Sequence, residues 1–167
     1  MYVVLENHLT SLCDTPKAYE GQPGFEVLRT VPGTWDEIRV PLARMNEHVT
    51  VARRSGSDWW VGSLNNGTER DLKLELDFLS EGDYQATIYT DAEDVERNPN
   101  NLDRLVRKVT RKDIIELNLA RDGGALLHIT KLRKNAGIIN RNRNNSASCT
   151  DNKRITLKIS EIREIAI

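Results

Sequence analysis

The feature that most constrains the fold of this chain is a two-residue periodicity that begins near Trp35. Val49 and Val51 alternate with Thr50 and Ala52, and residues 72–78 alternate between apolar and charged side chains. Successive side chains of a strand point to opposite faces, so this alternation is typical of a strand with one buried face. Residues 35–90 therefore predict a series of short antiparallel strands.

Turn residues separate the alternating segments at short intervals. Gly56 and Gly67 mark two of the predicted turns. Further apolar segments follow at residues 105–109, 115–119 and 125–129. About seven short strands with one-sided burial predict a mainly β fold, an antiparallel β-sandwich over residues 34–130.

Residues 1–33 carry a different pattern. Apolar side chains follow helical spacing over residues 1–13 and predict a helix. A second short helix is predicted between Pro23 and Pro32, because proline is favoured in the first turn of a helix and disfavours the helical conformation of the residue before it. One or two short helices therefore precede the sandwich.

The segment beyond residue 130 is basic and rich in asparagine, with few large apolar residues. Such a segment cannot bury enough surface to offset its ordering entropy. We expect residues 131–167 to form a partly disordered tail. The chain thus divides into a helical lead-in (1–33), a sandwich domain (34–130) and this tail.

The charge balance and the N-terminus bear on the possible partners. The chain has 24 basic and 25 acidic residues, so no net field favours nucleic acid. The opening MYVVLENHL lacks a cationic leader and is too short to cross a bilayer. We expect neither nucleic acid nor a membrane as a partner.

The acidic pair Asp36 and Glu37 is the first candidate for catalysis. Glycoside hydrolysis needs two carboxyl groups that flank one bond. Neighbours on a strand project to opposite faces, so these two cannot face one sugar together. We expect a structural role, in which Trp35 packs while Asp36 or Glu37 bonds to the backbone or to an arginine, and we predict no catalytic residue.

Metal sites are not indicated either. Calcium prefers oxygen ligands, but the acidic loop lacks the glycine spacing of an EF-hand and is expected to be a solvated loop; its acidic residues are Asp91, Glu93, Asp94, Glu96 and Asp103. The remaining candidate ligands lie far apart without paired spacing; they are His8, His48, His128, Cys13 and Cys149. We predict no metal site in the chain.

The adjacent tryptophans Trp59 and Trp60 are predicted to point to opposite faces of one strand. One belongs to the core and the other to the outer face of the sheet. An exposed aromatic ring there either covers a neighbouring domain or stacks on a sugar. The second use, with Trp60 as the stacking residue, would make the chain a carbohydrate-binding module.

Several short motifs occur in the order and at the spacing of a known family. The carriers are MYVVLENHL, LCDTP, Tyr19-Glu20, Val31-Pro32, Trp35-Asp36-Glu37, Val51-Ala52-Arg53-Arg54, Asp58-Trp59, Val61-Gly62, Arg70-Asp71-Leu72 and Leu76-Asp77-Phe78-Leu79 followed by Gly82. Residues 1–130 resemble the C-terminal end of glycoside hydrolase family 97. These enzymes are α-glucosidases and α-galactosidases with a (β/α)8 barrel followed by a β-sandwich.

The resemblance implies a non-catalytic domain. The family's catalytic acids and calcium ligands lie in the upstream barrel, so none is carried over and the chain is not expected to be active alone or to hold a cofactor. The implied partners are the barrel of the parent enzyme and further copies of the chain, in the periplasm or outside the cell. Without the barrel, we expect an exposed apolar patch in the lead-in, formed by Tyr2, Val3, Leu5, Leu9 and Phe25.

Overall fold

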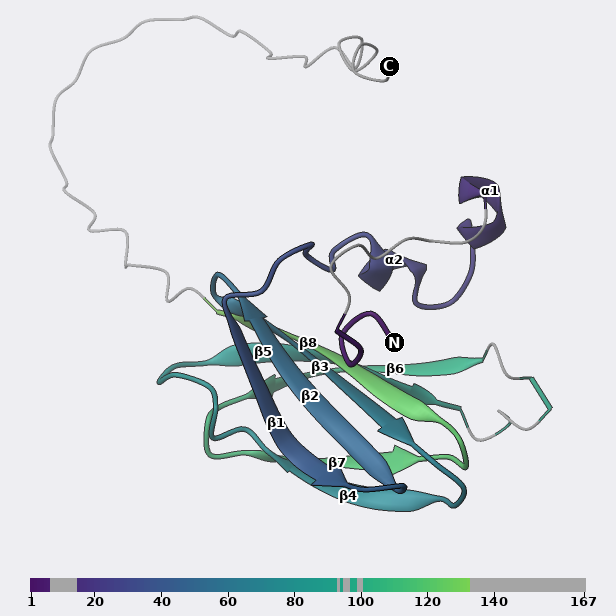
Figure 1. The fold of residues 1–167 in the computed structure, drawn as a ribbon. Coiled ribbons are helices and arrows are strands. Elements are labelled where there is room, and N and C mark those ends of the chain that lie inside the picture. Colours follow the sequence, from purple (N-terminus) through teal and green to yellow (C-terminus); the bar gives the residue numbers. More distant parts are fainter. Residues whose placement is uncertain (7–14, 93, 95–96, 99–100, 133–167) are drawn as a thin grey trace, which may run out of the picture. The chain divides into compact units, whose positions relative to one another are not determined.

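The computed structural model describes residues 1–6, 15–92, 94, 97–98 and 101–132. Two short helices come first, α1 (Pro16–Tyr19) and α2 (Phe25–Leu28). The strands of the described residues are β1 (Glu37–Arg44), β2 (His48–Ser55), β3 (Asp58–Asn65), β4 (Arg70–Glu75), β5 (Tyr84–Asp91), β6 (Leu102–Val109), β7 (Ile114–Leu119) and β8 (Gly124–Lys131). The predicted mainly β fold with one or two short helices before it is confirmed (Figure 1).

The strands form two antiparallel sheets. The larger is 6-stranded, in the order β1-β2-β3-β8-β5-β6, and the smaller pairs β4 with β7. Hairpins join β1 to β2, β2 to β3 and β5 to β6, whereas β8 returns from the end of the domain and inserts between β3 and β5. The smaller sheet covers part of one face of the larger one, which is the predicted sandwich.

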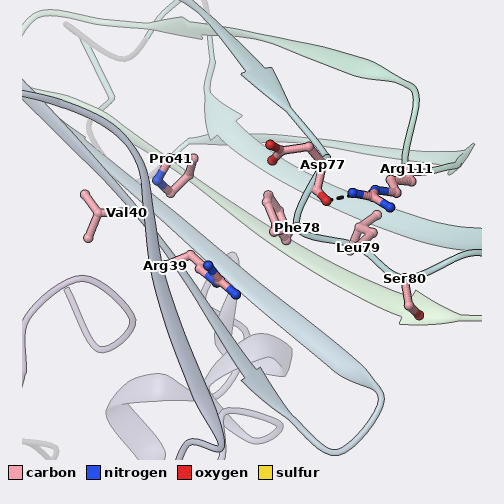
Figure 2. Close-up of a pocket in the computed structure, with 8 residues that line it drawn as sticks. All are labelled: Arg39, Val40, Pro41, Asp77, Phe78, Leu79, Ser80 and Arg111. Atoms are coloured by element: carbon pink, nitrogen blue, oxygen red, sulfur yellow. Dashed lines mark hydrogen bonds between the residues drawn. The ribbon is translucent and has the colours of Figure 1, made fainter.

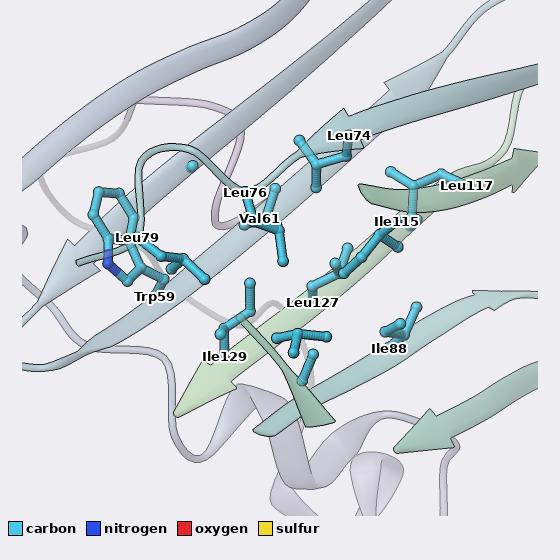
Figure 3. Packing of buried hydrophobic residues seen from close by; sticks show 14 of the residues in the cluster. Trp59, Val61, Leu74, Leu76, Leu79, Ile88, Ile115, Leu117, Leu127 and Ile129 are labelled. Atoms are coloured by element: carbon cyan, nitrogen blue, oxygen red, sulfur yellow. The ribbon is translucent and has the colours of Figure 1, made fainter. Parts of the chain in front are cut away.

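The core lies between the two sheets. Alternate residues of β3, β8 and β5 point toward β4 and β7, and most of the contacting side chains are fully buried (Figure 3). Trp59 caps one end of this core, with its ring 4.8 Å from that of Phe78. Each fully buried Leu or Ile contributes about 1.5–3 kcal/mol relative to an exposed one, so this cluster dominates the stability of the sandwich.

The alternation predicted for residues 72–78 matches the observed burial. Leu74 and Leu76 are buried in the core, while Lys73 and Glu75 of β4 face solvent. The strand pairs with β7 through a register in which Leu74 lies opposite Ile115. One face of the smaller sheet is therefore apolar and the other is wet, as the sequence indicates.

The lead-in differs from its prediction. Residues 1–6 form a turn, in which the Met1 carbonyl accepts hydrogen bonds from the Val4 and Leu5 amides, and this part of the helix predicted over residues 1–13 is wrong. Residues 7–14, and with them His8 and Cys13, lie outside the described residues, as do Cys149 and residues 133–167. In the part of the chain that is described, neither helix is long enough to cross a bilayer.

Candidate docking surface

The face of the six-stranded sheet that points away from the core is the candidate functional surface, here called the outer face. Its side chains are those opposite to the core-facing set: Arg53 of β2, Trp60 of β3 and His128 of β8 lie next to one another in register. The next row holds Val51, Gly62 and Leu126. These two rows differ in what covers them.

The N-terminal segment packs on β3 at Gly62, and this contact is here called the seat of the lead-in. A Cβ built at this position would lie 2.8 Å from Cγ2 of Val4 and 3.2 Å from Cβ of Val3, so the lead-in approaches the strand more closely than any side chain at residue 62 would allow. Glycine inside a strand often marks such a close approach. Val3 is buried against this seat, which contradicts its predicted place in an exposed apolar patch, whereas Leu5 is exposed.

A small cavity of about 120 Å³ lies beside this seat. Val3 and Leu28 line it from the lead-in, and Leu126 lines it from β8. Val27 of α2 is also buried. The lead-in therefore covers the outer face through apolar contacts, as the smaller sheet covers the core face.

A polar contact joins α2 to the far side of the same face. The Tyr89 hydroxyl donates to Oε1 of Glu26 at 3.2 Å and accepts from Nε of Arg104 at 3.4 Å. The bond to Tyr89, together with the nearby Glu26 carboxylate, raises the pKa of the Arg104 guanidinium. The lead-in is thus held by an apolar contact at Gly62 and by a polar contact between Glu26 and Tyr89.

Trp60 lies under a cluster of side chains rather than in solvent. The Trp35 ring meets it edge-on at 5.6 Å, and the His128 imidazole stacks on it at 4.5 Å. The Arg53 guanidinium lies 5.7 Å from the Trp35 ring. Trp60 is on the outer face, as predicted, but it is only 5% exposed, so the predicted exposed ring is wrong.

Three polar atoms of this cluster are buried without a hydrogen-bond partner among the described residues: Nε1 of Trp60, Nε of Arg53 and Nε2 of His128. Oδ2 of Asp58 lies 3.7 Å from Nε2 of His128, which is too long for a hydrogen bond. Burial lowers the pKa of His128, and the Asp58 carboxylate opposes this only in part. In this cluster the rings and the guanidinium are closely packed, although three of their nitrogen atoms have no hydrogen-bond partner among the described residues.

The acidic pair beside the cluster has the expected structural role. Oδ2 of Asp36 accepts from the Gly56 amide at 2.7 Å, in the turn between β2 and β3, where Gly56 has a positive φ of 62°. Glu37 bonds to Arg39 and to Arg54, and the bond to Arg39 is the main reason why the pKa of Glu37 is lowered. The two carboxylates tie β1 to the turn and to β2.

A groove of about 500 Å³ opens elsewhere, between β1 and the loop that follows β4 (Figure 2). Pro41 and Phe78 line its apolar part, and Nε of Arg111 donates to the Asp77 carbonyl at 3.0 Å. Asp77 supplies the one carboxylate among its lining residues. Since glycoside hydrolysis needs two, this groove has no catalytic arrangement.

Comparison with known families identifies the sandwich. A family model described as glycosyl-hydrolase 97 C-terminal, oligomerisation, matches residues 34–130. The chain belongs to this family. The matched range begins just before Trp35 and ends in β8, so the glycosyl-hydrolase 97 C-terminal domain is the two-sheet unit described above.

Curated relatives match more of the chain than the family model does. A retaining alpha-galactosidase of Bacteroides thetaiotaomicron is 31% identical over 130 residues, which is 77% of this chain and 20% of that protein. A probable retaining alpha-galactosidase of Streptomyces bingchenggensis is 29% identical over 125 residues, 73% of this chain and 18% of that protein. The chain therefore spans about a fifth of the length of these curated relatives.

Solved structures agree. A glycoside hydrolase family 97 enzyme from Pseudoalteromonas sp. strain K8, in complex with acarbose, superimposes with a TM-score of 0.67 at 30% identity. The match covers 72% of this chain and 20% of that chain. The resemblance to the C-terminal end of a family 97 enzyme is thus confirmed.

The predicted acidic loop of the glycosyl-hydrolase 97 C-terminal domain is only partly described. Oδ2 of Asp91 accepts from the Gly124 amide at 2.9 Å, and Oδ1 of Asp94 accepts from the Asn101 side chain at 2.8 Å. Glu93 and Glu96 lie outside the described residues. Within the described ranges, no three potential ligands from His, Cys, Asp and Glu gather in a way that could hold a metal ion.

Sequence reasoning missed two parts of the docking surface. Gly62 carried a usable signal, because an isolated glycine inside a strand pattern points to a bulge or a close backbone approach. The contact of Glu26 with Tyr89 and Arg104 carried none, since the partners come from segments far apart in the chain.

Proposed function

We propose that this chain is the non-catalytic accessory domain of a family 97 glycoside hydrolase, that it packs on the catalytic barrel through the lead-in and the outer face, and that it self-associates. The observation that carries the proposal is the seat at Gly62. Family membership supports the oligomerisation role, since the family is described by it.

The seat supports a docking role because it joins the lead-in firmly to the sandwich. Val3 is buried on β3 at Gly62, and the Tyr89 hydroxyl holds Glu26 of α2. These two contacts fix the lead-in on the outer face. A domain that precedes the lead-in in a longer protein would therefore be held against the same face. The outer face is therefore the surface we assign to the barrel.

The parent enzyme's activity is part of the same proposal. We propose that it hydrolyses α-glucosides or α-galactosides. The two curated relatives, named a retaining alpha-galactosidase and a probable retaining alpha-galactosidase, favour the second. Calcium in the barrel and a periplasmic or extracellular location stay predictions from the resemblance. The carbohydrate-binding alternative needs an accessible ring, and the burial of Trp60 does not favour it.

A chimera tests the docking role. This chain would replace the matched C-terminal fifth of the Bacteroides thetaiotaomicron relative, and we expect a folded enzyme that unfolds in one thermal transition and retains α-galactosidase activity. The same chimera with Gly62→Leu should unfold in two transitions, because the seat of the lead-in is blocked. Two separate transitions in the chimera without the substitution would contradict the proposal.

Sedimentation velocity of the chain tests the oligomerisation role. We expect the sedimentation coefficient to rise with concentration over the micromolar range. A chain that stays monomeric over this range would contradict self-association but leave the docking role to be judged by the chimera.

A further inference from the structure

The two edges of the six-stranded sheet differ in how well they are protected. The edge strand β1 carries Pro41 in its middle, and its register with β2 shifts between Arg39 and Leu42. Proline and bulges are devices that keep an edge from pairing with another chain. The opposite edge strand, β6, pairs with β5 without interruption over all eight residues and contains no proline.

Among the described residues, no strand pairs with the outer side of β6, which presents backbone groups in a regular order. Ala92 and Asn101 continue the register of Asp91 with Leu102, and the Ala92 amide donates to the Asn101 carbonyl. They therefore occupy a hydrogen-bonded position, and in an antiparallel ladder such positions recur at every second pair. Odd-numbered residues of β6 therefore bond to β5. The amides and carbonyls of Leu102, Arg104, Val106 and Lys108 point to the free edge.

Apolar side chains lie exposed along the same strand. Leu105 is 57% exposed and Val106 is 43% exposed, on opposite faces of β6. Leu105 lies on the side of the core, but the smaller sheet does not reach over it: β7 contacts β5, and Arg107 of β6 reaches only to the Ile114 carbonyl at 3.4 Å. A long edge with exposed apolar residues on both faces is a template for strand addition.

We propose that a second copy of this chain pairs with β6, antiparallel and about a twofold axis at Leu105. This inference rests on the proposed self-association and names its surface. Charge complementarity indicates that the partner is a second copy. Around a twofold axis perpendicular to the sheet, residues on the same face lie opposite each other. Asp103 therefore lies opposite Arg107 of the second copy, and this pair occurs twice. Leu105 lies opposite its own copy between them.

Neighbouring registers lack this complementarity. An axis at Arg104 places Arg104 opposite itself, and an axis at Val106 places Arg104 opposite Lys108. Like charges directly opposite each other are destabilising, whereas opposite charges are stabilising. Of these three axes, only the one at Leu105 avoids a like-charge pair. Pairing about it joins the two six-stranded sheets into one continuous sheet.

Charge reversal tests the pairing. In the full chain, Asp103→Arg places a cation opposite Arg107 of the second copy. Arg107→Asp places an anion opposite Asp103 of the second copy. Each single variant should weaken self-association by about tenfold or more, and the double variant should restore it, because the pairs are then reversed. All variants should keep the circular dichroism spectrum of the parent chain, since both side chains are exposed.

A matched pair of variants separates β6 from the other edge. Leu105 and Val40 are both 57% exposed. Leu105→Asp should weaken self-association, and Val40→Asp on β1 should leave it unchanged. Association that is insensitive to Leu105→Asp, or a double charge variant that fails to recover, would overturn the β6 surface while leaving the proposed oligomerisation intact; a monomeric parent chain would overturn both.

Discussion

The hydroxyls of Thr50 and Ser63 lie 2.8 Å apart and share one hydrogen bond across β2 and β3, on the core face of the larger sheet. Both side chains are buried. The pair is a polar contact on an otherwise largely apolar face, in which one hydroxyl donates and the other accepts.

The first prediction follows from this pair. Thr50→Val or Ser63→Ala alone leaves one buried hydroxyl unpaired and should lower the free energy of unfolding by about 1–3 kcal/mol. The double variant should cost clearly less than the sum, because no polar group is then stranded. Urea unfolding of the four proteins measures the coupling, and strictly additive costs would contradict this account.

The second prediction concerns the seat of the lead-in. Gly62→Val places side-chain atoms where Val3 and Val4 lie and should destabilise the chain by about 1–3 kcal/mol through overpacking. Hydrogen exchange of the amides in residues 1–6 should also become faster. Gly33→Val is the matched control, since no heavy atom lies within 4 Å of a Cβ built there. Equal exchange in both variants would refute the role of the seat.

The third prediction is a pH dependence that comes from His128. Burial lowers the pKa of its imidazole below the ordinary value of 6.5, so the folded state binds this proton less readily than the unfolded chain. Stability from this group is fully present above about pH 6.5 and is lost as the pH falls toward the folded-state pKa.

The His128→Phe variant isolates this contribution. Phenylalanine keeps an aromatic ring beside Trp60 but does not titrate, so the free energy of unfolding should fall less steeply in acid than that of the parent chain. Asp58→Asn should have the opposite effect, because it removes the carboxylate that partly opposes the shift. Chemical denaturation across the acid range checks both slopes, and parallel curves for the parent chain and His128→Phe would exclude the effect.

The fourth prediction concerns Asn65 at the end of β3. Its side-chain amide donates to the Thr68 carbonyl at 2.6 Å and to the Ala120 carbonyl at 2.8 Å, while its Oδ1 accepts from Arg70. Asn65 is 8% exposed, and Asn65→Asp places a carboxylate oxygen against the carbonyl oxygens of Thr68 and Ala120.

We expect Asn65→Asp to lower the melting temperature, with a loss of about 1–3 kcal/mol, because two hydrogen bonds are lost and oxygen then faces oxygen. Asn66→Asp serves as the control, because Asn66 is exposed and its side-chain amide donates to the Asn46 carbonyl at the surface. A melting temperature that responds equally to both substitutions would show that the buried amide has no special role.

The strand pattern was predictable because it depends on neighbours along the chain. Leu74 and Leu76 alternate with charged residues, and this alternation alone indicates which of them are buried. The opposite directions of Trp59 and Trp60 followed in the same way. The lead-in was harder to predict. The apolar spacing of residues 1–6 indicates a helix, but in the structure these residues form a single turn that packs on β3 at Gly62.

Thus the sequence by itself determined the strands, their buried faces, the structural role of Asp36 and Glu37, and the family. The tertiary structure decided that β8 inserts between β3 and β5, that Trp35 and His128 cover Trp60, and that β6 is an edge strand of the sheet within the described part of the chain. The physical reason is that periodicity specifies toward which face a side chain points, whereas its exposure depends on which distant segment packs on that face.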